Sequence, residues 1–167
     1  DPLEALRTPL SSIGESIVRA SHRPTVLVGP NAMASLVTGP RRVVVPVDGS
    51  ELSERALLPA VEVARWLAAP VWIVTVLTPD MEGAAAGMGI DPAAETGYVR
   101  RLAAELPEDI DAEFEVLHRR DIAEAILEFA GEDGVCVMSS HGRSGVARLA
   151  LGSVTAQVVR HARWPAV

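Results

Sequence analysis

Two long apolar runs in the middle of the chain predict buried strands. They are RRVVVPVD at residues 41–48 and APVWIVTVL at residues 69–77. Neither run alternates polar with apolar residues, which is typical of strands in a parallel sheet that is covered on both faces. Between them, apolar residues at helical spacing predict a helix with Ser53 as its N-cap. The pattern therefore indicates a strand–helix–strand unit with a right-handed crossover.

The rest of the chain continues this alternation of strands and helices. Residues 78–95 are rich in Gly, Ala and Pro, and they predict a mobile loop. The elements expected next are a helix over 93–105, a half-exposed strand over 111–117, a helix N-capped by Asp121 and ending near Gly131 or Gly134, a buried strand over 135–139, a helix over 153–162 and the start of a strand at 164–167. This order predicts an α/β fold in three layers, with a doubly wound, five-stranded parallel sheet.

The beginning of the chain repeats its end. LSSIGESIVRASHRPTV at residues 10–26 aligns without a gap on LGSVTAQVVRHARWPAV at residues 151–167. Because internal repeats reveal architecture, we interpret residues 1–30 as the last helix and strand of a preceding domain of the same kind. Residues 31–42 are then a linker and residues 43–167 the main domain. The alternative is an unrelated helix-and-strand extension.

Charge and composition exclude several classes of partner. The net charge is −7, and all fifteen basic residues are arginines. This balance disfavours nucleic acid and polybasic membrane binding, and the lack of lysine excludes a P-loop lysine or a Schiff base. No apolar run reaches the roughly 18 residues of a membrane span, so the cytoplasm is the expected location. The single cysteine, Cys136, lies in an apolar run and is expected in the core.

Candidate chemistry gathers at the predicted carboxyl ends of two strands. Asp48 ends the first strand, where open parallel sheets bind ligands, although an aspartate there also serves to turn the chain. After the fourth strand, Gly142 and Gly152 bracket a loop that leads into a helix, whose free amides favour an anion. An ordinary N-cap by Ser153 is the alternative. His141 lacks the GxSxG context of a nucleophile elbow and the spacing of a metal site.

These segments together resemble the universal stress protein family. VVVPVDGSELSERALLPAVEVA at residues 43–64 is similar to the family's first strand and helix. VMSSHGRSGVARLALGSV at residues 137–154 is similar to its ATP-binding signature, in which a glycine, two residues, a second glycine, nine residues, a third glycine and a Ser or Thr follow one another. The first glycine of the signature is replaced by Ser139. The N-terminal repeat also departs from the signature, because Ser11 aligns with Gly152. We therefore interpret the preceding domain as degenerate.

The resemblance implies a Rossmann-like fold of the adenine nucleotide alpha hydrolase type. It implies ATP, with or without Mg²⁺, bound between the first strand and the loop after the fourth, at most slow hydrolysis, and no tightly held metal. The base and ribose would contact Pro46, Asp48, Val76, Met138 and Ser139. The phosphates would contact Gly142, Gly152, Ser153, Val154 and Thr155, and Arg143 is added here for its charge.

The resemblance also implies an assembly and a regulatory role in stress. In the family the fifth strands pair antiparallel, so we expect a homodimer or a tandem pseudo-dimer through the last strands. Residues 24–29, PTVLVG, are expected to pair with residues 164–167 or with a second chain. A dimerisation or interaction module that binds no nucleotide is the alternative. An adenylating ligase is disfavoured, because PVDGSELS stands where a pyrophosphate loop would be.

Overall fold

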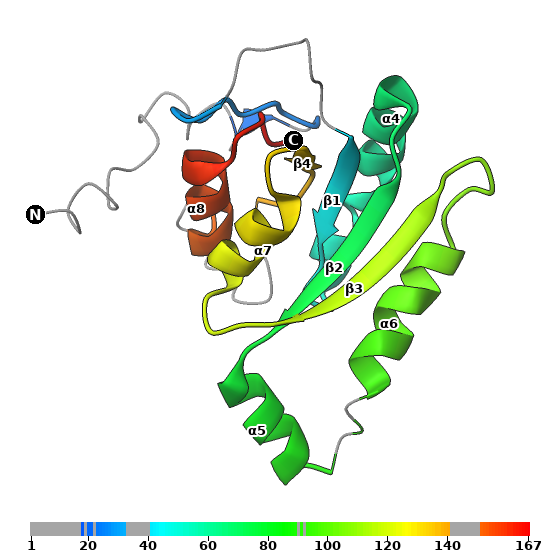
Figure 1. Cartoon of the computed structure of the whole chain (residues 1–167), viewed down its shortest axis with the longest axis vertical. Coiled ribbons are helices and arrows are strands. Elements are labelled where there is room, and N and C mark those ends of the chain that lie inside the picture. Colours follow the sequence, from blue (N-terminus) through cyan, green and yellow to red (C-terminus); the bar gives the residue numbers. More distant parts are fainter. Residues whose placement is uncertain are drawn as a thin grey trace, which may run out of the picture.

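A four-stranded parallel sheet forms the centre of the described structure (Figure 1). The computed structural model describes residues 18, 20–21, 23–32, 41–89, 91, 93–140 and 151–167. The strands are β1 (Arg42–Pro46), β2 (Val71–Leu77), β3 (Ala112–His118) and β4 (Gly134–Cys136). They pair in the order β3-β2-β1-β4, all parallel. The strand order therefore reverses at β1, whose neighbours β2 and β4 lie on opposite sides.

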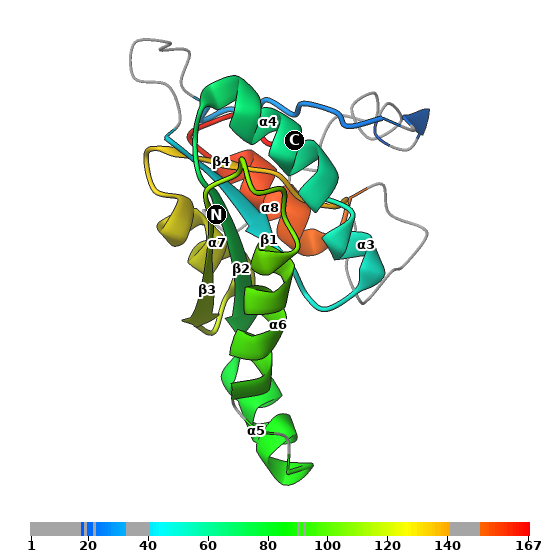
Figure 2. The same cartoon turned by 90° about the vertical axis from the view of Figure 1, so that its right-hand side faces the viewer.

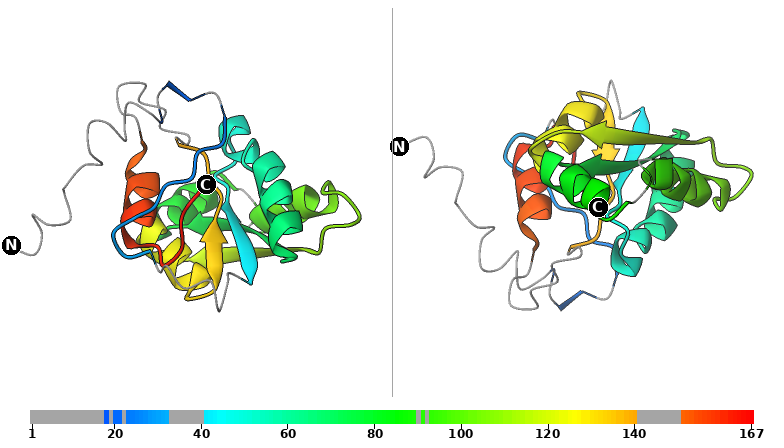
Figure 3. Two further views of the ribbon diagram at one scale, coloured as in Figure 1. Left: turned by 90° about the horizontal axis from the view of Figure 1, so that it is seen from above. Right: turned by 90° about the horizontal axis from the view of Figure 1, so that it is seen from below.

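Helices cover both faces of the sheet. They are α3 (Glu51–Glu54), α4 (Leu57–Leu67), α5 (Pro79–Gly87), α6 (Ala93–Ala104), α7 (Ile122–Ala130) and α8 (Ser153–His161). Seen from above, α4 and α6 lie on one side of the strands, and α7 and α8 on the other (Figure 3). The predicted three-layer α/β fold is thus confirmed.

The two faces of the sheet form two separate hydrophobic clusters. Val43 and Val45 pack with α4 and α6, whereas Val44 packs with α7 and α8. Successive strand side chains point to opposite faces, and both faces are apolar, which explains why the strand sequences do not alternate. Cys136 lies in the second cluster with 2% exposure. The expectation that it is a core residue is confirmed.

The fifth strand is reduced to a short contact in the described residues. The backbone of Val167 donates to the carbonyl of Cys136 and accepts from the amide of Met138, so the chain lies along the outer edge of β4. On its other side, Ala166 forms an isolated antiparallel bridge with Leu27. These contacts are too few for a ladder, so the described sheet has four strands where five were predicted.

The segment predicted as a mobile loop contains α5. Thr78 caps this helix by accepting a hydrogen bond from the amide of Met81, and Pro79 occupies the first turn. Alanines at 84–86 favour the helix. None of its residues is buried, and α5 lies at one end of the molecule (Figure 2). Without an apolar face, it has no hydrophobic periodicity, which is why the sequence pattern missed it.

Ser53 is not the N-cap that the sequence predicted. The N-cap of α3 is Ser50, whose hydroxyl accepts a hydrogen bond from the amide of Ser53. Ser53 is buried one turn later, and its hydroxyl donates to the carbonyl of Ser50. The helices expected after residues 93 and 121 and the strand expected from 111 form within a residue or two of their predicted bounds. No helix in the described ranges is long and apolar enough to cross a membrane.

Candidate functional site

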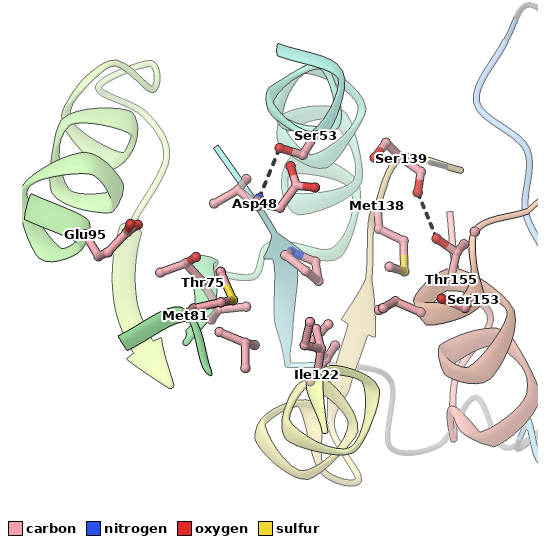
Figure 4. A pocket seen from close by; sticks show the side chains of 17 residues that line it. Asp48, Ser53, Thr75, Met81, Glu95, Ile122, Met138, Ser139, Ser153 and Thr155 are labelled. Atoms are coloured by element: carbon pink, nitrogen blue, oxygen red, sulfur yellow. Dashed lines mark hydrogen bonds between the residues drawn. The ribbon is translucent and has the colours of Figure 1, made fainter. Parts of the chain in front are cut away.

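A cavity of about 310 Å³ opens at the carboxyl ends of β1, β2 and β4 (Figure 4). This is the position where the strand order reverses, and open parallel sheets bind ligands at such a point. Helices α5 to α8 supply further lining residues. The apolar ones are Pro46, Val47, Val74, Val76, Met81, Ile122, Ile126, Met138 and Val154, and the polar ones are Asp48, Ser53, Thr75, Glu95, Ser139, Ser153 and Thr155, with Gly152 between them.

Asp48 both turns the chain and faces the cavity. Its Oδ1 accepts hydrogen bonds from the amide of Ser50 at 3.1 Å and from the Ser50 hydroxyl at 2.6 Å. Its own amide donates to the hydroxyl of Ser53 at 3.2 Å. These bonds fix the loop between β1 and α3, as expected for an aspartate in a turn. The same residue lines the cavity, so the two interpretations of Asp48 are compatible.

The first turn of α8 supplies hydrogen-bond donors to the opposite side of the cavity. Gly152 is the N-cap, without a side-chain cap, and the amide of Ala156 makes the first helical bond, to the Gly152 carbonyl. Ser153 is therefore not the N-cap. The amides that follow Gly152 have no partner within the helix, and their partial positive charge favours an anion. The absence of a Cβ at Gly152 lets a ligand approach them closely.

Two hydrogen bonds join the start of α8 to the end of β4. The amide of Gly152 donates to the carbonyl of Ser140 at 2.7 Å. The hydroxyl of Thr155 donates to the carbonyl of Ser139 at 3.0 Å. These bonds hold the helix N-terminus beside Met138 and Ser139, at the edge of the cavity. The loop glycine Gly142 and its neighbours His141 and Arg143 lie outside the described residues.

A pair of side chains joins α6 to α3 near the cavity. The hydroxyl of Tyr98 donates to Oε1 of Glu54 at 3.0 Å. Burial, and then this hydrogen bond, raise the pKa of Tyr98 to about 12, so the phenol stays neutral and keeps donating. Glu95 lies about one turn before Tyr98 on α6 and reaches the cavity. The pair therefore positions the beginning of α6 against the site.

The structure brings together the predicted site residues that it describes. Pro46, Asp48, Val76, Met138 and Ser139 lie around one cavity with the start of α8, which comprises Gly152, Ser153, Val154 and Thr155. Their role in binding a nucleotide stays a prediction. Within the described part of the chain, the charged residues that line the cavity are Asp48 and Glu95, and both are acidic. Across the described residues, no group of three His, Cys, Asp or Glu side chains is placed to hold a metal ion.

The sequence interpretation missed several lining residues, chiefly on the side formed by α5 and α6. Met81 comes from the segment that was predicted as a loop, and Glu95 lies where that loop and the predicted helix over 93–105 overlap, so no pattern pointed to either as a site residue. Thr75 did leave a signal, because it is the polar residue inside the apolar run VWIVTVL. A hydroxyl in a strand that is buried on both faces needs a reason, and the cavity provides one.

Comparisons with known proteins agree on one family. The model of the universal stress protein family matches residues 39–167. A search of curated proteins found no match to the chain.

Solved structures of universal stress proteins are also similar. One from Archaeoglobus fulgidus is 26% identical with a TM-score of 0.58, covering 77% of this chain and 96% of its own. Another from the same organism, in complex with dAMP, is 24% identical with a TM-score of 0.52, covering 78% and 97%. A third, from Archaeoglobus fulgidus DSM 4304, is 23% identical with a TM-score of 0.61 and covers 94% of this chain but 53% of its own.

Proposed function

The chain belongs to the universal stress protein family, and from this premise we propose that it binds an adenine nucleotide, with ATP as its ligand, in the cavity at the ends of β1 and β4. The phosphates would lie at the first turn of α8, and the base would lie toward β2 and α6. The observation that carries the proposal is the start of α8, where Gly152 leaves free amides at the edge of the cavity.

The volume and lining of the cavity suit such a ligand. Its volume of about 310 Å³ falls at the lower end of the roughly 300–1,000 Å³ that small-molecule sites occupy. Apolar walls from Val76, Ile122 and Met138 suit a purine ring, and the carboxylate of Asp48 suits a ribose hydroxyl. The dAMP bound to the relative from Archaeoglobus fulgidus supports the same class of ligand. The polyphosphate, with any Mg²⁺ that it brings, is proposed from the signature spacing between Gly142 and Gly152.

A regulatory role fits this site better than fast catalysis. ATP would change the contacts of a cytoplasmic stress protein with its partners, and any hydrolysis would be slow. The second proposal concerns assembly: residues 1–30 belong to a preceding domain, and the last strands of the two domains pair. The bridge between Leu27 and Ala166 supports it, and the bond from Asn31 Nδ2, in the linker, to the carbonyl of Arg160 at 3.2 Å holds this segment beside α8. The relative from Archaeoglobus fulgidus DSM 4304 also supports it, because about half of that longer chain, 53%, matches 94% of this one.

Binding is tested by titration calorimetry with ATP on the wild type, on Gly152→Val and on Gly87→Val. The backbone of Gly152 is extended, at φ −63° and ψ 156°, which valine also adopts, so the fold is expected to survive. The new side chain would occupy the space of the phosphates and weaken binding by more than about tenfold, or about 1.4 kcal/mol. Gly87→Val is the matched control, since a Cβ there meets nothing within 4 Å and lies outside the cavity.

Absence of any heat on ATP titration, and of nucleotide in the supernatant of the denatured protein, would contradict the proposal. The protein would then act as an interaction module that binds no nucleotide. Undiminished binding by Gly152→Val would place the nucleotide elsewhere. Light scattering on the purified chain separately distinguishes a homodimer from a monomer with paired end segments.

A further inference from the structure

We propose that Glu95, on the first turn of α6, makes the site select a nucleotide whose base carries an exocyclic amino group. The inference rests on the proposed nucleotide function and assigns a specificity-determining residue to it. Three observations carry it, namely the side of the cavity on which Glu95 lies, the contacts that hold α6 there, and the absence of a protein partner for its carboxylate among the described residues.

The cavity has two chemically different sides (Figure 4). Ser139, Ser153 and Thr155 lie on one side of Asp48, where the amides of α8 begin. Thr75 and Glu95 lie on the other side, toward β2 and α6. A phosphate beside Glu95 would be repelled by its carboxylate, whereas the helix N-terminus attracts it. A bound nucleotide is therefore oriented with its phosphates at α8 and its base at Glu95.

The beginning of α6 is held firmly against this side of the cavity. Tyr98 binds Glu54 of α3 about one turn after Glu95. Val99 and Leu102 are 0% and 2% exposed and pack in the core below. These contacts fix the backbone from which Glu95 reaches the cavity, so its carboxylate does not depend on a flexible loop for its position.

Two polar groups face the base side without a protein partner in the described part of the chain. Glu95 is half-buried and makes no ion pair or side-chain hydrogen bond there. Thr75 is 4% exposed, and its hydroxyl makes no side-chain hydrogen bond to a described residue. No fully buried side-chain polar atom of the described residues lacks a partner, so this hydroxyl is reached from the cavity. Both groups are thus available to a ligand.

The chemistry of these two groups assigns the selectivity to Glu95. A carboxylate only accepts hydrogen bonds, whereas a hydroxyl both donates and accepts. Glu95 therefore matches the 6-amino group of adenine and repels the 6-oxo group of hypoxanthine, while Thr75 accommodates either base. Because Glu95 is half-buried, a base without the amino group leaves its carboxylate without this hydrogen bond and partly shielded from water, which weakens binding of the analogue.

Calorimetric titration with ATP and with ITP tests this, because the two nucleotides differ at this edge of the base. The wild type is expected to prefer ATP by about tenfold or more, as for hydrogen bonds to a charged group. Glu95→Gln is expected to bring the ratio close to one, because the amide can donate to the 6-oxo group. Glu113→Gln is the matched control: it removes the same charge from an exposed site on β3 and should leave the ratio unchanged. Glu95→Ala, as a second variant, should also bring the ratio close to one, because it removes both the hydrogen bond to the 6-amino group of ATP and the repulsion of the 6-oxo group of ITP.

Loss of the negative charge of Glu95 could strengthen the binding of any nucleotide through its phosphates. The ratio of ATP affinity to ITP affinity cancels this effect, because both nucleotides carry the same phosphates. If Glu95→Gln keeps the wild-type preference, or if the wild type binds ATP and ITP equally, the inference is wrong while the proposed function stands. If the wild type binds neither nucleotide, both are wrong.

Discussion

Gly134 is the first residue of β4 and lies against the end of α7, where there is no room for a methyl group. A Cβ at this position would lie 2.6 Å from the carbonyl oxygen of Ala130 and 2.8 Å from its Cα. Both atoms belong to the backbone, so α7 and β4 would have to separate to admit the side chain. Because β4 leads directly to Met138 and Ser139, the displacement would also reach the candidate site.

Gly134→Ala is therefore expected to lower the free energy of unfolding by about 2 kcal/mol, within the roughly 1–3 kcal/mol usual for overpacking. In a chain of this length, the midpoint of thermal unfolding should fall by about 4–8 °C. Gly97→Ala is the matched control, because it makes the same change in the middle of α6, where a Cβ meets nothing within 4 Å. It should stabilise the protein by about 0.5–1 kcal/mol, since alanine favours a helix.

Urea unfolding followed by tryptophan fluorescence measures both variants. Trp164 is 5% exposed, and its Nε1 donates to the carbonyl of Glu132, two residues before Gly134. Of the three tryptophans in the chain, Trp164 therefore lies in the region that the substitution disturbs. The steric explanation is wrong if Gly134→Ala has the same midpoint of urea unfolding as the wild type. It is also wrong if Gly97→Ala loses as much stability as Gly134→Ala does.

Two further predictions concern alkaline stability and the N-terminal segment. Burial raises the pKa of the Cys136 thiol to about 12 from 9.0, and burial with the bond to Glu54 raises that of Tyr98 to about 12. The chain has no lysine that would titrate in the same range. The free energy of unfolding should therefore stay constant to about pH 9 and fall toward pH 12, because the unfolded chain releases the thiol and phenol protons at a lower pH than the folded chain does. Cys136→Ala combined with Tyr98→Phe should flatten this decline in urea unfolding from pH 8 to 11, and an equally steep decline would contradict it. In Gly29→Ala, the new Cβ would overlap the carbonyl oxygen of Val159 and push the N-terminal segment away from α8. Hydrogen exchange should therefore show loss of amide protection at the bridge between Leu27 and Ala166 and nowhere else. Unchanged protection of these amides would contradict the contact between the N-terminal segment and α8.

The fold was predictable where burial leaves a simple pattern in the sequence. The runs around Val44 and Val74 are apolar on both faces, which is specific for strands inside a layered α/β fold. The position of Asp48 then followed from topology, since ligands bind at the carboxyl ends of such strands. Asp121 likewise gave the start of α7, because its side chain caps the amide of Glu124. These features are set by local chemistry and periodicity.

What the sequence did not predict depends on contacts that periodicity does not record. α5 buries nothing, so its helix rests on the cap by Thr78 and on alanine propensity. Ser53 sits where an N-cap was plausible, but Ser50 takes that role one turn earlier. Met81 and Glu95 reach the cavity because α5 and the beginning of α6 lie near the carboxyl end of β2, which is a property of the folded chain.

The most direct test of the central claim is a crystal structure of the protein grown with a non-hydrolysable ATP analogue. We expect phosphates within hydrogen-bond distance of the amides of Ser153, Val154 and Thr155, with the base between Val76 and Met138 and its amino group toward Glu95. A nucleotide bound outside this cavity, or one bound with its phosphates at Glu95, would contradict it.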